Sequence, residues 1–385
     1  VGAPISYYFL NLFTQNQVIP VAVPLVLIST SSYWALNTFL SGRDNFSLSV
    51  WSGSLNTLIQ AIGKVTLVIV GFGIWGIVWG TVVGPILVLP ILVMWIDERP
   101  SVPSWEDLKS IGEYAKWSIP NGFVGTALSR MDTVLLGWLA TAAVAGKYQV
   151  GLQITMPAVF ISSVIGTGLM GRVSNLESRQ REWEDDLWNS LSYSSILSVP
   201  IFFGSLVIGE EIAVTVFGSR YSGAGIFVVG LALHRLIKTQ ISPFKSVIAG
   251  LDRPDIHFKI SLFSFIVNII LGVSLWWVIG ASGIVFATVL TSIGSYLMSI
   301  YYFHKISKSS LIYTPPFVTQ IVSGVIMATT VYGATEILGI YTWVHIIIYI
   351  VIGALTYGGS ELFLSSHLRA TILGILDDIN EKYLA

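Results

Sequence analysis

Charged side chains interrupt the long apolar stretches of this sequence at few positions, and those positions carry its clearest chemical signal. Four cations and one carboxylate qualify: Lys64, Arg130, Arg235, Lys238 and Asp132. A lone charge in the middle of a bilayer is energetically costly, so such residues are candidates for a functional site. Arg235 and Lys238 lie three residues apart and share one helix face, where an anion or water must compensate their repulsion. The interior is therefore predicted to be positive.

This excess of positive charge predicts the class of ligand. A diphosphate group carries several negative charges and suits the Arg fork and the Lys point charge, whereas an organic cation needs acidic partners. We predict that Arg130, Arg235 and Lys238 attract such a group and that Lys64 contributes.

Each charge also has a structural alternative. Arg130 can bond to backbone carbonyls that lack a helical partner near a proline. It can also pair with Asp132 through another helix, because the two side chains lie about 200° apart around their own helix and do not meet within it. The Lys64 side chain can keep its aliphatic part in the apolar region and place its ammonium at the outer membrane–water interface. Arg235 and Lys238 can pair with helices that precede this sequence. Asp132 is either a proton or ion site for coupling, or a partner in a helix-orienting ion pair.

Composition defines the environment in which these charges act. Of the 385 residues, 54% are apolar and 11% are charged, and the mean hydropathy is +0.76. Soluble domains carry about 25% charged residues, so this chain is predicted to lie within a membrane.

The net charge of -1 gives no basic field for nucleic acid, and the lack of cysteine excludes disulfides and thiolate sites. The five histidines lack metal-ligand spacing, so no metal, cofactor or enzymatic centre is expected.

Apolar segments long enough to cross a bilayer recur along the chain, since such a helix needs roughly 20 mostly apolar residues. We predict an all-α polytopic membrane protein with about eleven transmembrane helices in this sequence. The expected spans are 18–40, 47–70, 73–95, 112–138, 147–170, 188–209, 223–249, 257–279, 283–303, 316–336 and 342–364. Ser104 and Asp107 have the spacing of a capping box at the start of the helix that enters the fourth span.

Lysine and arginine residues between the spans predict the orientation of the chain. Twelve fall on one side: Arg43, Arg99, Lys109, Arg172, Arg179, Arg181, Arg253, Lys259, Lys305, Lys308, Arg369 and Lys382. Lys147 and Arg220 fall on the other side. By the positive-inside rule the first side is cytoplasmic. We therefore predict a multi-pass protein of the cytoplasmic (plasma) membrane with its C-terminus in the cytoplasm.

Two segments of the sequence recur at nearly the same offset. Gly73–Val82 is similar to Gly280–Val289 at an offset of 207 residues, and Gly42–Asp44 to Gly250–Asp252 at 208. Chance similarity between apolar helices is the alternative explanation. An even number of spans separates the paired segments, so the repeats run in the same direction. Extrapolation places about three further spans ahead of Val1.

The repeat predicts a fourteen-helix bundle with two lobes, arranged as six, six and two helices, of which about the first three precede this sequence. The expected regions are a partial N-terminal lobe over 1–96, a cytoplasmic inter-lobe linker over 97–111, a C-terminal six-helix lobe over 112–303, two extra transmembrane helices over 304–364, and a cytoplasmic amphipathic tail over 365–385.

Several short motifs resemble those of one superfamily. They are Ser129–Trp138 (SRMDTVLLGW) with Pro120 ahead of it, Gly146–Val150 (GKYQV), Phe217–Tyr221 (FGSRY) and Gly280–Thr288. In these segments the chain resembles the polysaccharide flippase branch of the multidrug, oligosaccharidyl-lipid and polysaccharide exporter superfamily. The resemblance implies two six-helix lobes around a central cavity that opens alternately to each side, and movement of lipid-linked oligosaccharide from the inner to the outer leaflet.

We accordingly predict a flippase for polyprenyl-diphosphate-linked oligosaccharide in polysaccharide or glycoprotein assembly. The diphosphate would bind the cations named above, and amides would bond to sugar hydroxyls: Asn121, Gln149, Gln153 and Gln240. Membrane lipids and glycan-assembly proteins are candidate partners.

Three alternatives remain open at this stage. A multidrug or cation antiporter of the same superfamily should carry more intramembrane carboxylates than Asp132. A membrane glycan polymerase or glycosyltransferase should offer a larger loop than the longest cytoplasmic break, at about 171–187. A non-transporting scaffold is the third.

Overall fold

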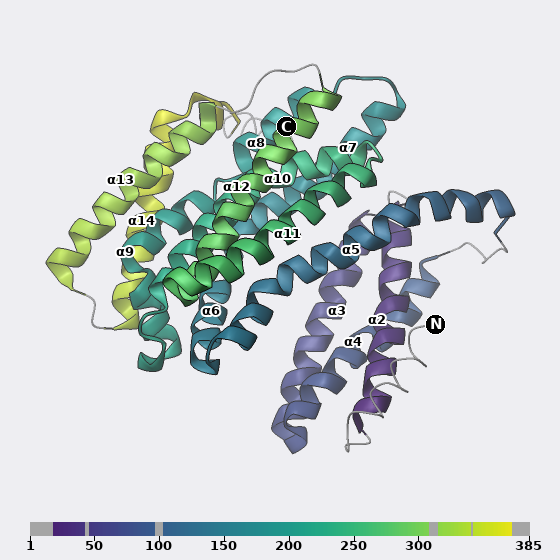
Figure 1. Cartoon of the computed structure of the whole chain (residues 1–385), viewed down its shortest axis with the longest axis horizontal. Coiled ribbons are helices and arrows are strands. Elements are labelled where there is room, and N and C mark those ends of the chain that lie inside the picture. Colours follow the sequence, from purple (N-terminus) through teal and green to yellow (C-terminus); the bar gives the residue numbers. More distant parts are fainter. Residues whose placement is uncertain (1–17, 43–45, 97–102, 308–314, 340–341, 372–385) are drawn as a thin grey trace, which may run out of the picture. The chain divides into compact units, whose positions relative to one another are not determined.

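The computed structural model describes residues 18–42, 46–96, 103–307, 315–339 and 342–371, and within these ranges every secondary-structure element is a helix (Figure 1). The chain divides into two compact units, Val1–Pro103 and Ser104–Ala385. The boundary falls inside the segment 97–111 that the sequence assigns to a linker.

The first unit contains, in its described part, α2 (Val18–Gly42), α3 (Phe46–Leu67) and α4 (Ile74–Met94). Glycines of α4 let its backbone approach α3, because a Cβ atom on Gly80 would lie 2.5 Å from Cγ of Lys64. Buried apolar side chains of α2 and α4 form the core of this unit: Tyr33, Leu40, Val88 and Leu92.

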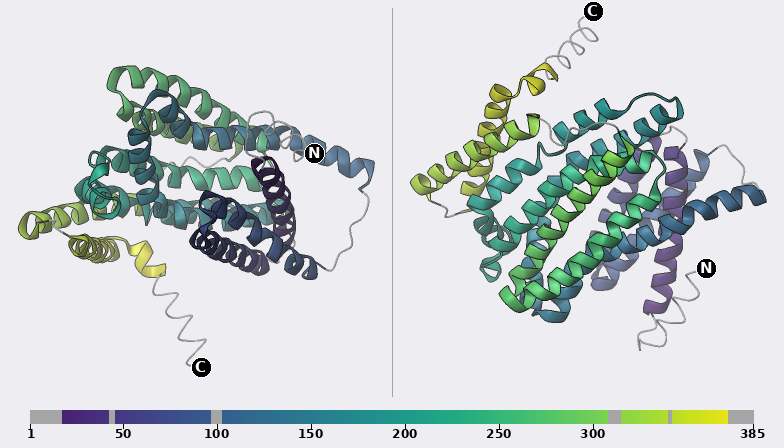
Figure 2. Two further views of the ribbon diagram at one scale, coloured as in Figure 1. Left: turned by 90° about the horizontal axis from the view of Figure 1, so that it is seen from below. Right: turned by 45° about the horizontal axis from the view of Figure 1, so that its top comes forward.

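The second unit contains the longer series of helices. They are α5 (Trp105–Leu139), α6 (Ala142–Thr155), α7 (Phe160–Ser178), α8 (Glu184–Ser194), α9 (Ser198–Phe217), α10 (Gly225–Gly250), α11 (Pro254–Ile279), α12 (Ala281–Ile306), α13 (Pro315–Leu338) and α14 (Trp343–Leu364). Helix α10 is central, because it packs against α6, α7, α8, α9, α11 and α12 (Figures 1 and 2). Its side chains join separate apolar clusters, through Leu231 in one and Phe244 in another. Helix α10 can therefore position side chains against several neighbours.

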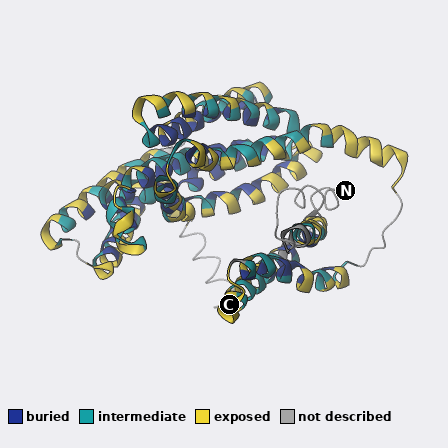
Figure 3. Cartoon of the chain, turned by 60° about the horizontal axis from the view of Figure 1, so that its bottom comes forward, coloured by how far each residue is buried: buried dark blue, intermediate teal, exposed yellow. Residues whose placement is uncertain are grey.

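Helix α5 begins at the predicted capping box. The Asp107 backbone N–H donates to the Ser104 hydroxyl at 3.2 Å, and the Ser104 N–H donates to the Asp107 carboxylate at 2.9 Å. The Ser104 hydroxyl also donates to this carboxylate and holds its pKa below the usual range. The helix starts at Trp105, ahead of the predicted span, and its first turns are exposed (Figure 3). The capping box is confirmed.

Nine helical stretches of the described residues are long and apolar enough to cross a membrane, and each overlaps one predicted span. The other two predicted spans, 112–138 and 223–249, fall on α5 and α10, where charged residues interrupt the apolar sequence. An all-helical membrane protein is confirmed, whereas the counts of eleven and fourteen helices stay predictions. Most of the predicted tail over 365–385 lies outside the described residues.

The two members of the sequence repeat have the same local structure. Gly73 precedes α4 with φ 54° and ψ -132°, and Gly280 precedes α12 with φ 65° and ψ -142°. Glycine reaches such positive φ values at little steric cost, whereas other residues rarely do. Three residues later, Gly76 and Gly283 lie where an added Cβ atom would overlap the backbone of the preceding helix. The repeat therefore encodes one type of helix pair twice.

Candidate functional site

A cavity of about 520 Å³ lies in the second unit, lined by residues of α5, α6, α7, α10, α11 and α12. Helix α10 contributes a row of lining side chains at helical spacing: Arg235, Lys238, Ser242 and Lys245. Residues three, four and seven positions apart share one helix face, so the sequence of α10 aligns three cations along one wall of the cavity.

These three α10 cations have no ion-pair partner among the described side chains. Ion pairs in the described part of the chain join Arg172 to Asp186, and join Arg253 and Lys259 to Asp255. Like charges that line a membrane cavity need a compensating anion or water. The α10 wall is therefore suited to receive an anionic group.

Asp132 is the one carboxylate among the residues that line this cavity. Its Oδ2 accepts hydrogen bonds from the Tyr148 hydroxyl at 2.5 Å and the Thr288 hydroxyl at 2.7 Å. The Asn268 side chain donates in turn to the Thr288 hydroxyl at 3.4 Å. The second carboxylate oxygen, Oδ1, is buried without a partner among the described residues. Side chains from α6 and α12 thus hold one oxygen and leave the other for a proton, an ion or a ligand hydroxyl.

A hydroxyl-rich wall completes the cavity on α11 and α12. Its members are Ser261, Ser264, Asn268, Thr288, Thr291, Ser292 and Ser295. The Ser264 and Ser295 hydroxyls lie 2.5 Å apart, and Ser292 lies 2.6 Å from Nδ1 of His234. Hydroxyl and amide groups can donate to and accept from a polyol, because each hydroxyl offers both functions. The cavity therefore combines a cationic wall with a polar uncharged one.

Three predicted site residues line this cavity: Asp132, Arg235 and Lys238. Arg130 is close in sequence but is exposed on α5 and is not part of the lining. Lys64 belongs to the first unit, where its ammonium donates to the Gln60 side chain at 3.3 Å. Ligand binding by Arg130 and Lys64 stays a prediction.

The structure does not gather the four predicted amides in one place. Gln149 and Gln153 are exposed on α6. Gln240 is buried and donates at 2.9 Å to the Ser195 hydroxyl, and it is not part of the cavity lining. Asn121 lies 3.4 Å from the ring of a cavity-lining histidine on α11. Bonding of these amides to sugar stays a prediction.

Sequence analysis missed Lys245, His257 and the hydroxyl-rich wall. Lys245 follows Lys238 by seven residues, a spacing that returns to the same helix face and could have revealed it. On α12, hydroxyl residues recur at three- and four-residue intervals from Thr288 to Ser295, which is the same kind of signal. His257 has no such signal, because a single histidine near a helix start is common.

A family model described as "Polysaccharide biosynthesis protein" matches residues 6–225, which is more than half of the chain. The chain belongs to this family. Alignments to individual relatives cover more of the chain than the family model does.

Among the curated relatives is the probable low-salt glycan biosynthesis flippase Agl15 of Haloferax volcanii, 26% identical over an alignment of 342 residues that covers 84% of this chain and 71% of the relative. The probable flippase AglR of the same organism is 24% identical over 361 residues, covering 92% and 75% of the two chains. The solved structure of the lipid II flippase MurJ, in its inward closed conformation, superposes with a TM-score of 0.65 and 17% identity over 94% of this chain and 79% of that one.

These matches identify a polysaccharide flippase of the multidrug, oligosaccharidyl-lipid and polysaccharide exporter superfamily. The chain is a multi-pass membrane transporter and not an enzyme. The likeness to MurJ concerns the fold alone, because the sequence identity is low.

Proposed function

We propose that the protein moves polyprenyl-diphosphate-linked oligosaccharide across the cytoplasmic membrane by alternating access. The observation that carries this proposal is the row of cations on α10 that faces a cavity of the second unit and has no ion-pair partner among the described residues. Arg235 and Lys238 bind the diphosphate, because multiply charged phosphate oxygens are strong acceptors for guanidinium and ammonium groups.

The hydroxyl-rich wall extends the proposal to the sugar. Sugar hydroxyls both donate and accept hydrogen bonds, as do the Ser and Thr side chains of α11 and α12. The polyprenyl chain stays in the bilayer while the polar headgroup crosses. Arg130 and Lys64 contribute further positive charge, and the four predicted amides contribute further hydrogen bonds.

Asp132 is the proposed coupling residue. Its Oδ1, which no described residue contacts by a hydrogen bond, offers a place for a proton or a cation, while Tyr148 and Thr288 hold the other oxygen. Protonation would remove the negative charge that these two hydroxyls stabilise, and this would alter contacts between α5, α6 and α12. Such a change at a helix junction is a route by which an ion gradient can drive alternation.

The proposal includes the arrangement of the whole protein. Eleven helices of this chain cross the membrane as part of a fourteen-helix, two-lobe bundle, and the C-terminus is cytoplasmic. The substrate arrives from the cytoplasmic leaflet, where glycan-assembly proteins would supply it.

Binding to the purified protein in lipid nanodiscs tests the proposal. The ligands are a polyprenyl-diphosphate oligosaccharide and a lipophilic cation, and the variant is Arg235→Ala/Lys238→Ala. We expect the wild type to bind the anionic lipid and the double variant to bind it at least about tenfold more weakly. Lys305→Ala is the matched control, because this exposed lysine of α12 lies outside the cavity lining. Binding of the cation alone would favour a drug antiporter instead.

A further inference from the structure

Three helices around the cavity each place polar residues at two levels. The pairs are Asn121 and Asp132 on α5, Lys245 and Arg235 on α10, and His257 and Asn268 on α11. The members of each pair are ten or eleven residues apart, which is about 15–17 Å along a helix. We call the level of Asp132, Arg235 and Asn268 the aspartate level. We call the level of Asn121, Lys245 and His257 the histidine level.

Contacts within each level support this grouping. At the aspartate level, Asn268 reaches Asp132 through the Thr288 hydroxyl. At the histidine level, the Asn121 amide nitrogen lies 3.4 Å from Nδ1 of His257. The Lys245 ammonium is close enough to the His257 ring for the two to interact electrostatically. The cavity therefore has two polar ends and not one.

The histidine level contains polar atoms that the described residues leave unsatisfied. Nε2 of His257, Oδ1 of Asn121 and Oγ of Ser118 are buried, and the described part of the chain offers them no hydrogen-bond partner. Buried polar atoms normally have partners, so several orphans in one place indicate a bound ligand or water. Lys245 and His257 both line the cavity, and Asn121 contacts the His257 ring from outside that lining.

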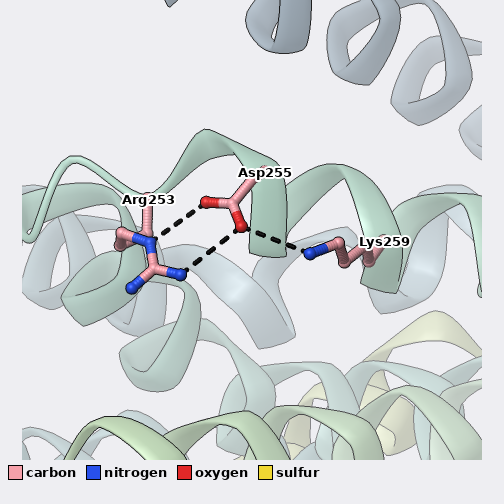
Figure 4. Close-up of polar contacts among 3 residues, drawn as sticks. All are labelled: Arg253, Asp255 and Lys259. Carbon is pink, nitrogen blue, oxygen red and sulfur yellow. Dashed lines mark hydrogen bonds and ion pairs between the residues drawn. The ribbon is translucent and has the colours of Figure 1, made fainter.

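The charge at this level is positive. The nearby Asp255 carboxylate is already engaged by Arg253 at 3.1 Å and by Lys259 at 3.3 Å (Figure 4). Asp132, the carboxylate of the cavity lining, belongs to the opposite level. No carboxylate of the cavity lining therefore compensates Lys245 at its own end, whereas Arg235 shares its level with Asp132 without forming an ion pair among the described residues.

We propose that Lys245 and His257 form a second anion-binding position, at which the Asn121 amide orients the His257 ring and which takes the phosphate of a phosphorylated lipid. This inference rests on the proposed function and deepens it. The two phosphates of a diphosphate share a bridging oxygen, so one diphosphate cannot occupy both ends of a row about 15 Å long. The headgroup occupies the histidine level first, on the side predicted to be cytoplasmic, and then the aspartate level, with Lys238 between them.

A binding titration of the full chain in nanodiscs tests for two positions. The probes are farnesyl diphosphate and inorganic pyrophosphate, and the variants are Lys245→Ala/His257→Ala and Arg235→Ala/Lys238→Ala. We expect two diphosphates per wild-type chain and one in either double variant, with about a tenfold weaker affinity for the lost position. Lys305→Ala should match the wild type. An unchanged stoichiometry and affinity in Lys245→Ala/His257→Ala would refute the second position.

Cysteine protection gives a readout that does not require removal of the histidine-level residues. The chain has no cysteine, so Ala249→Cys on α10 and Ser129→Cys on α5 each introduce a single reporter into the cavity lining. Ala249 lies one turn beyond Lys245, and Ser129 lies near Asp132. In the Arg235→Ala/Lys238→Ala background, farnesyl diphosphate should slow alkylation at position 249 but not at position 129. Equal alkylation at position 249 with and without the probe would overturn the proposal.

The outcomes separate this inference from the function on which it rests. If Arg235→Ala/Lys238→Ala abolishes all binding while Lys245→Ala/His257→Ala leaves it intact, the second position is refuted and the flippase proposal stands. If the wild type binds no farnesyl diphosphate, both fail. Protection by farnesyl diphosphate but not by pyrophosphate supports a position for lipid-borne phosphate, and protection by both supports one that also accepts free anion.

Discussion

The helix pairs α3–α4 and α11–α12 have the same glycine geometry but different polar contents. Gly73 and Gly280 share a positive φ, and Gly76 and Gly283 press against the preceding helix in the same way. On α3, polar side chains form a chain from Lys64 through Gln60 to Asn56, at 3.3 and 3.2 Å. On α11 and α12 the polar residues line the cavity instead. The repeat therefore preserves packing and leaves the chemistry free to differ.

Helices α2 and α10 show this difference most clearly. At the repeat offset of 208, the α10 cations Arg235, Lys238 and Lys245 correspond to Leu27, Thr30 and Asn37 of α2. In α2 the last of these accepts hydrogen bonds from two serines of α3, a contact between neighbouring helices. A helix in this place in the repeat therefore does not need cations, which supports a functional role for those of α10.

Giving α10 the residues of α2 is expected to have the largest effect. The variant is Arg235→Leu/Lys238→Thr/Lys245→Asn, in which each cation becomes the residue at the matched α2 position. We expect binding of farnesyl diphosphate to weaken by at least about a hundredfold, because each removed cation takes charge-assisted hydrogen bonds with it. Titration calorimetry in nanodiscs measures this loss.

The fold of this triple variant serves as its control. Thermal unfolding in detergent should stay near that of the wild type, since α2 packs with the same residue types. A variant that folds normally and still binds the diphosphate tightly would show that the α10 cations are not the ligand site.

Adding a side chain at the shared close approach should have the next largest effect. Gly283→Val and Gly76→Val each place a Cβ atom in the backbone of the preceding helix, so each should destabilise the protein by about 1–3 kcal/mol. The midpoint of unfolding in detergent gives the comparison. Gly171→Val is the matched control, because nothing lies within 4 Å of a Cβ atom at that exposed position. If only one of Gly283→Val and Gly76→Val lowers the unfolding midpoint, the helix pairs α11–α12 and α3–α4 are not structurally equivalent.

Much of the fold was accessible from the sequence, because apolar length alone marks a spanning helix. Nine predicted spans match candidate membrane helices, and the remaining two are the charged helices α5 and α10. The i, i+3 spacing of Arg235 and Lys238 also placed both on one face, and both line the cavity. Local spacing is sufficient for these features.

The rotation of α5 was not accessible from the sequence. Arg130 and Asp132 lie two residues apart, and one is exposed while the other is buried against Tyr148 and Thr288. The face that a helix buries depends on its partners in the tertiary structure, and α5 has a charged residue on both faces. The hydrogen-bond partner of Gln240 across to Ser195 is likewise a long-range contact that no spacing rule reveals.

Removing the shared positive-φ glycine should have a smaller effect than the close-approach substitutions. Gly280→Ala and Gly73→Ala force a Cβ atom into a backbone conformation that other residues avoid, while nothing lies within 4 Å of the added atom. Strain alone should cost about 1–2 kcal/mol at each site. Gly168→Ala, at an open position within α7, should be neutral or slightly stabilising in the same unfolding assay. Equal unfolding midpoints for Gly280→Ala, Gly73→Ala and Gly168→Ala would mean that the backbone turns before α4 and α12 relax to accept a side chain.

The smallest expected difference concerns Thr81 and Thr288, which match at the repeat offset of 207. The Thr81 hydroxyl donates to a carbonyl of its own helix, whereas the single proton of the Thr288 hydroxyl is shared between such a carbonyl at 3.0 Å and Asp132 at 2.7 Å. Thr288→Val should therefore cost about 1 kcal/mol more than Thr81→Val, a modest value because Tyr148 still donates to the same carboxylate oxygen. Unfolding midpoints of the two variants give this difference. Equal costs would mean that Asp132 depends on Tyr148 alone, and the Thr288 contact would then be better explained as packing between α5 and α12 than as support for a coupling carboxylate.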